Sequence, residues 1–384
     1  MSSFVRAHTG KQSWRRRLAL LCAGVTLAFT ASLASAAEPE TSTPSYEYDP
    51  SWPRPFPNNW LIGDVTGVSV DRHDHVWILH RPSTMSKFDT LAGNDPPTAK
   101  CCVAAPPVLE FDTDGTLLKA WGGPKTTPDW FDTEHSIFVD AEDNVWILGA
   151  GARDGQLLKF TADGKLLLKI GKKGEFGAAD DTGMLGKPTD MVVDTKRREI
   201  YVSDGYRNKR VIVFDSDTGA FKRQWTAFGR KVDPAYSSTR GEQTAHKTEL
   251  DLFTTVHCVT MTAGEIYVCD RTNNRIQVFK PDGTYVRALF FNRKLGGLGS
   301  TWDAAPDPLD PDRLLVLDGS NSEIGVVDRK TGAVIGSYMN KGRYGGQMHW
   351  PHQFASDKEG RLYIGEVDNG GRVQRFVPVA EAGQ

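Results

Sequence analysis

The feature that most constrains the fold is a sequence pattern that recurs along the chain. Each copy has a short apolar strand ending in Asp, a tight turn, and a second strand with Tyr or Trp between apolar residues. A third strand, an Asp-Gly or Thr-Gly turn and a fourth strand follow. The clearest copies begin at Glu134, Pro188 and Val256. Four short strands in each of several repeats are typical of propeller blades, which bury their faces by stacking on neighbours.

Six copies of the pattern fill the chain after its first 64 residues. The other three open at Val65, near Trp302 and at Pro351, which leaves roughly 53 residues per copy, slightly above the ~40–50 of one blade with its loops. The last copy lacks a fourth strand, and the segment around Tyr46–Tyr48 is a candidate to supply it and so remove an open sheet edge. The sequence therefore predicts an all-β fold, a six-bladed β-propeller over residues 65–378. Residues 37–64 form an N-terminal leader, and 379–384 a tail.

The first 36 residues read as an export signal. Three arginines, Arg15, Arg16 and Arg17, precede an apolar run from Leu18 to Leu33, and Ala34-Ser35-Ala36 offers a small-x-small cleavage pattern. We predict a signal peptide over residues 1–36 and a periplasmic or secreted protein without stable membrane insertion. An uncleaved anchor is the alternative, although the run is short for a membrane span. The Sec and twin-arginine routes both remain open.

Export places the four remaining cysteines in an oxidising compartment. Cys258 and Cys269 lie on adjacent predicted strands joined by a short turn, where antiparallel register would set them opposite each other. A disulfide is therefore possible there. Cys101 and Cys102 lie in a Pro-rich loop and are either a vicinal disulfide or two free thiols, because connectivity cannot be deduced from sequence.

The charge balance narrows the possible partners. The chain has 46 Lys and Arg against 48 Asp and Glu, a formal net charge of -2. A nucleic-acid-binding protein would show a strong basic excess on one face. We expect no nucleic acid partner and a monomer.

Three histidines share one position within the repeat. Counted back from the Asp that ends the first strand, His135 and His352 lie five residues before it in the second and sixth copies, and His257 holds the same place in the fourth. Alternate blades of six are related by about 120° around the axis, and first strands line the central channel. The three imidazoles should therefore converge on one axial point, as in an open zinc site. Iron, nickel or copper would also suit these ligands.

The remaining histidines that we considered show no such register. We expect them on the surface or in loops: His73, His75, His246 and His349.

The repeat resembles the NHL repeat in the stretch from Asp270 to Phe279, which carries its D-x-x-N-x-R-I-x-x-F pattern. The mature chain from about Tyr46 to Phe376 resembles the peptidyl-α-hydroxyglycine α-amidating lyases. The motifs that carry this likeness are the three histidines, the D-G-Y-x-N motif around Tyr206, the His-Arg pair ending at Arg81 and the V-x-D-R motif ending at Arg271.

The resemblance implies a zinc-dependent carbon–nitrogen lyase that cleaves a carbinolamide to an amide and glyoxylate without consuming water. It implies zinc on His135, His257 and His352, and catalytic roles for three further residues. Tyr206 would move the proton, Arg81 would hold the substrate carboxylate, and Arg271 would assist. The resemblance thus implies a small-molecule or peptide substrate with a free carboxylate.

Departures from the family's pattern include Arg207 and Gly186, which stand where vertebrate members have a cysteine pair, and two further residues that concern calcium and the pocket. Gln353 stands where the family has an Asp that serves a structural calcium, which argues against calcium here. Trp350 stands where Met is usual, so we expect a changed wall of the pocket. The alternatives to a lyase are a metal-dependent hydrolase such as a lactonase, which usually recruits acidic ligands, and a non-catalytic NHL-repeat binding protein, because the fold alone does not fix the function.

Overall fold

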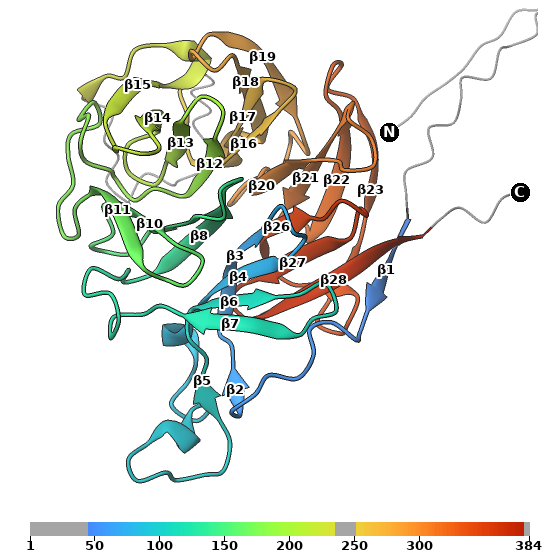
Figure 1. Ribbon diagram of the computed structural model, residues 1–384. Coiled ribbons are helices and arrows are strands. Elements are labelled where there is room, and N and C mark those ends of the chain that lie inside the picture. The colour runs from blue at the N-terminus through green and yellow to red at the C-terminus, as the bar shows by residue number, and fades with distance from the viewer. Residues whose placement is uncertain (1–44, 235–250, 380–384) are drawn as a thin grey trace, which may run out of the picture. The chain divides into compact units, whose positions relative to one another are not determined.

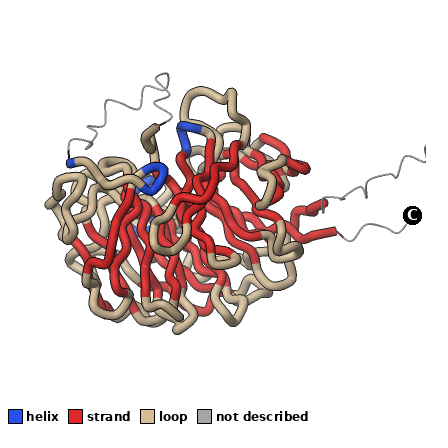
Figure 2. Tube along the Cα trace, turned by 90° about the horizontal axis from the view of Figure 1, so that it is seen from above, coloured by secondary structure: helices blue, strands red, loops and turns tan. Residues whose placement is uncertain are grey.

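Strands make up nearly all the regular structure of the computed structural model, which describes residues 45–234 and 251–379 (Figure 1). Short 3-10 helices occur only in the loops of these ranges, as the view from above shows (Figure 2). The chain divides into two units, Met1–Thr41 and Ser42–Gln384. The predicted signal peptide, the first part of the leader, most of the predicted tail and His246 lie outside the described residues.

The described residues form six four-stranded sheets, which we number as blades 1 to 6. Blade 1 contains β3 (Asp64–Val70), β4 (Val76–Arg81), β6 (Val108–Phe111) and β7 (Leu117–Trp121). Blade 2 contains β8 (Glu134–Val139), β9 (Val145–Gly149), β10 (Gln156–Phe160) and β11 (Leu166–Gly171). Blade 3 contains β12 (Asp190–Asp194), β13 (Glu199–Asp204), β14 (Arg210–Asp215) and β15 (Phe221–Trp225).

The second half of the ring repeats this arrangement. Blade 4 contains β16 (Val256–Thr262), β17 (Glu265–Asp270), β18 (Arg275–Phe279) and β19 (Tyr285–Phe290). Blade 5 contains β20 (Asp303–Pro306), β21 (Arg313–Asp318), β22 (Glu323–Asp328) and β23 (Val334–Tyr338). Blade 6 contains β26 (Pro351–Ser356), β27 (Leu362–Glu366), β28 (Arg372–Val379) and β1 (Ser45–Asp49).

The first and the last strand of the described chain meet in blade 6. β1 pairs antiparallel with β28, with Tyr46 opposite Pro378 and Tyr48 opposite Phe376 (Figure 1). The Nε atom of Arg375 donates to Asp49 at 3.0 Å. The segment that the sequence offered as a closing strand therefore supplies the fourth strand of the last blade.

The ring is closed by contacts between the innermost strands. β3 contacts β8, and the series continues through β12, β16, β20 and β26 back to β3. One apolar cluster fills each space between neighbouring blades. Trp77 and Leu79 of blade 1, for example, pack with Ile137 and Val145 of blade 2. Each such side chain gains about 1.5–3 kcal/mol on burial, so stacking holds the blades together. The predicted six-bladed propeller is confirmed.

The Asp that ends the first strand of a repeat has a clear structural role. In blades 1, 2 and 6 its Oδ1 atom accepts two backbone N–H groups of the following turn, and its Oδ2 accepts from the aromatic residue of the second strand. These residues are Asp71, Asp140 and Asp357. The Asp carboxylate thus accepts hydrogen bonds from backbone N–H groups of the turn that have no partner in a strand.

Short elements decorate the loops. β2 (Trp60–Leu61) pairs parallel with β5 (Val103–Ala104), and β24 (Asn340–Lys341) with β25 (Gln347–Met348). The 3-10 helices are η1 (Pro82–Thr84), η2 (Leu91–Gly93), η3 (Ala227–Gly229) and η5 (Arg271–Asn273). No helix within the described ranges is long and apolar enough to cross a membrane.

Both cysteine pairs are disulfide-bonded in the structure. Cys258 and Cys269 lie directly opposite each other on β16 and β17, as antiparallel register predicts. Of the two states considered for Cys101 and Cys102, the structure has the vicinal disulfide.

Candidate metal centre

The three register histidines lie on the innermost strands of blades 2, 4 and 6. His135 is on β8, His257 on β16 and His352 on β26. Each one is the extra residue of a β-bulge, because the pairing with the second strand of its blade shifts at that point. A bulge turns the side chain of the extra residue away from the regular alternation. The repeated bulge therefore gives the three imidazoles the same direction.

The imidazoles converge. Their ring centroids lie 4.7 Å apart for His135 and His352, 5.2 Å for His257 and His352, and 5.3 Å for His135 and His257. One nitrogen from each ring falls in a group whose members all lie within 4.8 Å of one another. All three residues are buried. This is the arrangement expected from alternate blades of six.

Each ring is oriented by the next blade. The Nδ1 atoms of His135, His257 and His352 donate to the backbone carbonyls of Thr189 (2.7 Å), Trp302 (2.6 Å) and Thr66 (2.8 Å), respectively. A carbonyl oxygen only accepts, so the proton of each neutral ring lies on Nδ1 and the lone pair on Nε2. Metal-binding histidines usually have this type of partner on the distant nitrogen.

Burial keeps the three rings neutral. It is the main cause that lowers the pKa of His135 and of His257 well below the usual value, and it lowers the pKa of His352 to about 3. The positive charge of Arg271 lowers all three pKa values further, and that of Arg81 lowers those of His135 and His352. Neutral imidazole is the form that binds metal, so these rings need lose no proton to do so.

The Tyr206 hydroxyl lies beside this point of convergence. It is 3.0 Å from Nε2 of His135 and 3.2 Å from Nε2 of His257. Because both nitrogens are acceptors, the hydroxyl donates to one of them at a time. The phenol oxygen therefore lies where it can exchange a proton with any group bound at the three nitrogens.

A close backbone approach positions Tyr206. A Cβ atom at Gly205 would collide with the carbonyl group of Val256 on β16, so only glycine lets this loop pack against the strand that bears His257. The preceding Asp204 holds the loop through bonds from Gly186 N (2.6 Å) and Asn208 Nδ2 (2.8 Å). The Asp, Gly and Asn residues of the D-G-Y-x-N motif thus fix the conformation of the loop that carries Tyr206.

Two arginines flank the histidines. Arg81, the last residue of β4, donates from Nε to the carbonyl of Glu134 at 2.7 Å, and its Nη1 is 3.9 Å from Asp64. Arg271 is buried, with its guanidinium 4.5 Å from the Trp302 ring centroid and 5.8 Å from that of Tyr206. The Nε atom of Arg271 has no hydrogen-bond partner among the described residues. A buried cation in this state favours an anionic ligand.

These side chains surround a cavity of about 480 Å³. Its lining includes Arg81, His135, Tyr206, Arg271 and His352. His257 does not line it but borders a narrow space that His135 and His352 share. The structure therefore gathers all six predicted site residues at one end of the channel, with five of them on the cavity wall.

Sequence reasoning missed the residues that orient the histidines. Thr66, Thr189 and Trp302 use backbone carbonyls, which carry no residue signature. One signal was available, because each of them lies five residues before the first-strand Asp, at the histidine position of the odd-numbered blades.

The two departures that concern calcium and the pocket have clear places. Trp350 does not line the cavity, contrary to expectation. Its ring packs against that of Trp302, and Trp302 does line the cavity. It therefore acts on the cavity only through that residue. The Gln353 side chain bridges blades, since Nε2 donates to Ser136 and Asp190 at 3.0 Å and Oε1 accepts from Val68 N at 3.1 Å.

Comparison with known proteins identifies relatives of this chain in sequence. Residues 253–279 match the NHL repeat model. The chain is 26% identical to peptidyl-alpha-hydroxyglycine alpha-amidating lyase 1 of Drosophila melanogaster over 87% of this chain and 60% of the fly protein. It is 27% identical to the peptidylglycine alpha-amidating monooxygenase of Rattus norvegicus over 86% of this chain, but only 32% of the rat protein. The chain thus spans less than two thirds of these relatives.

Two further likenesses concern the repeat and the fold. NHL repeat-containing protein 3 of Homo sapiens is 29% identical over 71% of this chain and 73% of the human protein. A solved structure of a Bacteroides thetaiotaomicron protein of unknown function superposes with a TM-score of 0.51 at 12% identity, covering 83% of this chain and 70% of the other. At this identity, the likeness supports the fold and no shared function. The chain is an NHL-repeat six-bladed β-propeller related in sequence to the peptidyl-α-hydroxyglycine α-amidating lyases.

Proposed function

We propose that the protein is a zinc-dependent lyase that cleaves the N–C bond of a peptidyl-α-hydroxyglycine or a similar carbinolamide. The observation that carries the proposal is the Tyr206 hydroxyl at 3.0 Å and 3.2 Å from the lone-pair nitrogens of His135 and His257, on the wall of a cavity that two arginines share. The name of the fly relative, an α-amidating lyase, supports the same activity.

The histidine set suits zinc. Three neutral imidazoles present Nε2 lone pairs to one point and are held by carbonyls on Nδ1. Three protein ligands with an open side are the usual form of a catalytic zinc site. When bound, zinc would act as a Lewis acid that lowers the pKa of a substrate hydroxyl. Iron, nickel and copper are the other metals that such ligands accept.

The two arginines would bind the carboxylate of the substrate. Arg81 has Nε committed to Glu134, which leaves its terminal nitrogens for a ligand. Arg271 contributes a buried guanidinium whose Nε atom has no hydrogen-bond partner within the described ranges. Charge-assisted bonds from guanidinium to carboxylate are short and directional, so these two side chains would orient the α-carbon toward Tyr206.

Tyr206 can carry the proton that the reaction moves. In R–CO–NH–CH(OH)–COO⁻, the phenol oxygen takes the hydroxyl proton while the phenol gives its own proton to the amide nitrogen. The C–N bond breaks and the C=O bond forms. The products are R–CO–NH₂ and glyoxylate, and no water enters. Positioned proton transfer of this kind contributes about 10²–10⁴-fold in rate.

The same proposal includes export. The arginine-led apolar segment and the Ala34–Ala36 pattern support a signal peptide and a periplasmic or secreted location. A substrate with a free carboxylate would then be a small molecule or a peptide available outside the cytoplasm.

The decisive experiment combines metal analysis with product detection. Protein purified without chelators and loaded with one equivalent of zinc is given α-hydroxyhippurate, and benzamide and glyoxylate are quantified. The proposal expects both products in equal amounts, and loss of activity with a chelator. Zinc-loaded, folded protein that releases no glyoxylate from this substrate or from peptidyl-α-hydroxyglycines would overturn it. Hydrolysis of a lactone panel instead would favour the hydrolase alternative.

A further inference from the structure

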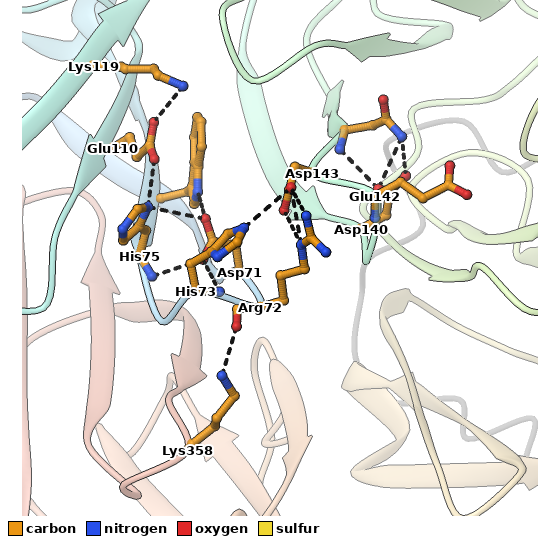
Figure 3. Close-up of polar contacts among 12 residues, drawn as sticks. Asp71, Arg72, His73, His75, Glu110, Lys119, Asp140, Glu142, Asp143 and Lys358 are labelled. Carbon is orange, nitrogen blue, oxygen red and sulfur yellow. Dashed lines mark hydrogen bonds and ion pairs between the residues drawn. The ribbon is translucent and has the colours of Figure 1, made fainter.

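A second cluster of potential metal ligands lies at the other end of blade 1. Asp71 follows β3, His75 precedes β4 and Glu110 lies on β6 (Figure 3). Arg81 ends β4 at the cavity, whereas His75 precedes its first residue, so the two points are separated by about 20 Å of strand. The cluster is therefore distinct from the histidine centre.

The spacing of the three side chains suits one ion. Nδ1 of His75 is 2.9 Å from Oε1 of Glu110 and 3.6 Å from Oδ2 of Asp71. Zinc bonds of about 2.0–2.2 Å in a tetrahedral site place ligand atoms about 3.3 Å apart, which lies between these two values. The three ligand atoms are all within 4.8 Å of one another. Only small side-chain movements would be needed.

The site is held on one side and open on the other. Asp71 is fixed because Oδ1 accepts from the backbone N–H groups of His73 and His75, and Oδ2 accepts from Trp77 Nε1 at 3.0 Å. The Asp71 and Glu110 side chains are 4% and 5% exposed, whereas that of His75 is 32% exposed. Oriented carboxylates with one solvent-facing imidazole form a partial cage that an ion can enter from solvent.

The charge at the cluster is incompletely balanced. Oε2 of Glu110 is buried and has no hydrogen-bond partner in the described part of the chain. The cation near it is Lys119, with Nζ at 3.4 Å, but the same Nζ is 3.0 Å from Asp163. Glu110 thus shares its ammonium partner with a second carboxylate, Asp163. A buried carboxylate without full pairing is costly, and a divalent cation would offset that cost.

Equivalent positions in other blades lack this combination. Glu110 lies opposite Trp77 in the sheet, as Lys159 lies opposite Trp146 in blade 2 and Arg375 opposite Tyr363 in blade 6. The place of His75 is taken by Asn144, which bonds Asp140, and by Arg361, which bonds Asp357. In those blades a single carboxylate meets neutral or cationic partners. Blade 1 instead brings two carboxylates and an imidazole together.

We infer that blade 1 binds a second divalent transition-metal ion of the zinc class through Asp71 Oδ2, His75 Nδ1 and Glu110 Oε1. The ion ties the β3–β4 turn to the third strand of the blade, so its role is structural. The inference is independent of the proposed lyase activity. Histidine register did not reveal this site, because only His75 among its ligands is a histidine and Glu110 comes from a separate strand, β6.

The test uses cobalt(II) as a spectroscopic substitute for zinc. In a His135→Ala/His257→Ala background, which removes the channel site, we expect one equivalent of cobalt to bind with a visible d–d absorption band. Adding Glu110→Gln or His75→Ala should remove that equivalent. Adding His73→Ala, a neighbouring histidine that is not in the cluster, should leave it unchanged.

Two results would overturn the inference: no cobalt bound by the folded background variant at millimolar metal, or binding that Glu110→Gln leaves intact. If the background variant does not fold, zinc content is compared in the otherwise unaltered chain. Two equivalents should fall to one in Glu110→Gln, and an unchanged value contradicts the site. Glyoxylate release is followed in parallel, so failure of this site and failure of the lyase proposal are read separately.

Discussion

At the scale of single residues, the Tyr206 hydroxyl is distinguished by what it touches. Its two polar partners in the structure are the lone-pair nitrogens of His135 and His257. We predict that Tyr206→Phe keeps its zinc and its fold but loses about 10²–10⁴-fold in kcat, as expected for removal of a proton-transfer group. Metal content and glyoxylate release measure the two effects. Tyr344→Phe, at an exposed site, is the matched control. Turnover unchanged by Tyr206→Phe would remove this residue from the reaction.

His80 gives a second residue-scale prediction, concerning pH. It is buried, with Nε2 bonded to the carbonyl of Pro106, and burial lowers its pKa to about 4. The unfolded chain takes up the proton near pH 6.5 but the folded chain does not, so stability falls as pH drops from about 6.5 towards 4. The loss should reach about 3 kcal/mol.

Denaturant titrations from pH 7.5 to 4.5 measure this loss. His80→Gln should make the profile less steep because it removes one titrating group, while the buried His135, His257 and His352, whose pKa values are also lowered, continue to contribute. His73→Gln, at a half-exposed ring, is the control and should leave the slope unchanged. A profile for His80→Gln as steep as that of the unaltered protein would show that other groups cause the acid sensitivity.

The residue-scale predictions succeeded where a side chain recurs at a fixed distance from the first-strand Asp. His135, His257 and His352 were found in this way because the spacing fixes which residue faces the channel. The spacing does not show that a bulge sets their direction, because pairing irregularities depend on the neighbouring strand. It also does not show which aromatic ring packs on Arg271, since Trp302 arrives from a different blade.

At the scale of the elements, β1 is the strand whose loss has the clearest consequence. It completes blade 6 and brings Asp49 to Arg375, which is 8% exposed. We predict that a chain starting at Ser51 loses at least about 3 kcal/mol of unfolding free energy, because a buried arginine loses its carboxylate and a sheet edge is uncovered. Urea unfolding gives the value. A chain starting at Ser45, which keeps β1, is the control and should keep the stability of a chain starting at Ala37; equal stability of the Ser45 and Ser51 truncations would contradict the prediction.

The elements themselves were largely predictable. The repeated apolar strands and Asp-Gly turns predicted six blades. The last copy had only three strands, which indicated that a segment from elsewhere in the chain supplies the fourth. The parallel pairing of β2 with β5 was not predicted, because strands of two residues are too short to show a periodic pattern of apolar residues in the sequence. The disulfide of Cys258 and Cys269 followed from register, whereas the loop pair at Cys101 has no register to follow.

At the scale of the whole molecule, a bound ion at the histidines would link blades 2, 4 and 6, which are not neighbours in the ring. A ligand that binds only the folded state stabilises it, by about 2.7 kcal/mol at a concentration 100 times its Kd. We therefore predict that zinc raises the melting temperature and that EDTA reverses the increase. Differential scanning calorimetry measures it in a Glu110→Gln background, which excludes the blade 1 cluster. The same background with His135→Ala should show little increase; an equal increase in both would mean that the ion binds elsewhere.

The carbonyl that orients each histidine comes from the following blade, so the working unit of this ring is two blades, not one. Blades 2 and 3, 4 and 5, and 6 and 1 each contribute one ring and its support. Insertion or deletion of a single blade would break this alternation even if the propeller closed. Recombination and circular permutation of such chains should therefore preserve the centre only when blades are kept, moved or exchanged in pairs.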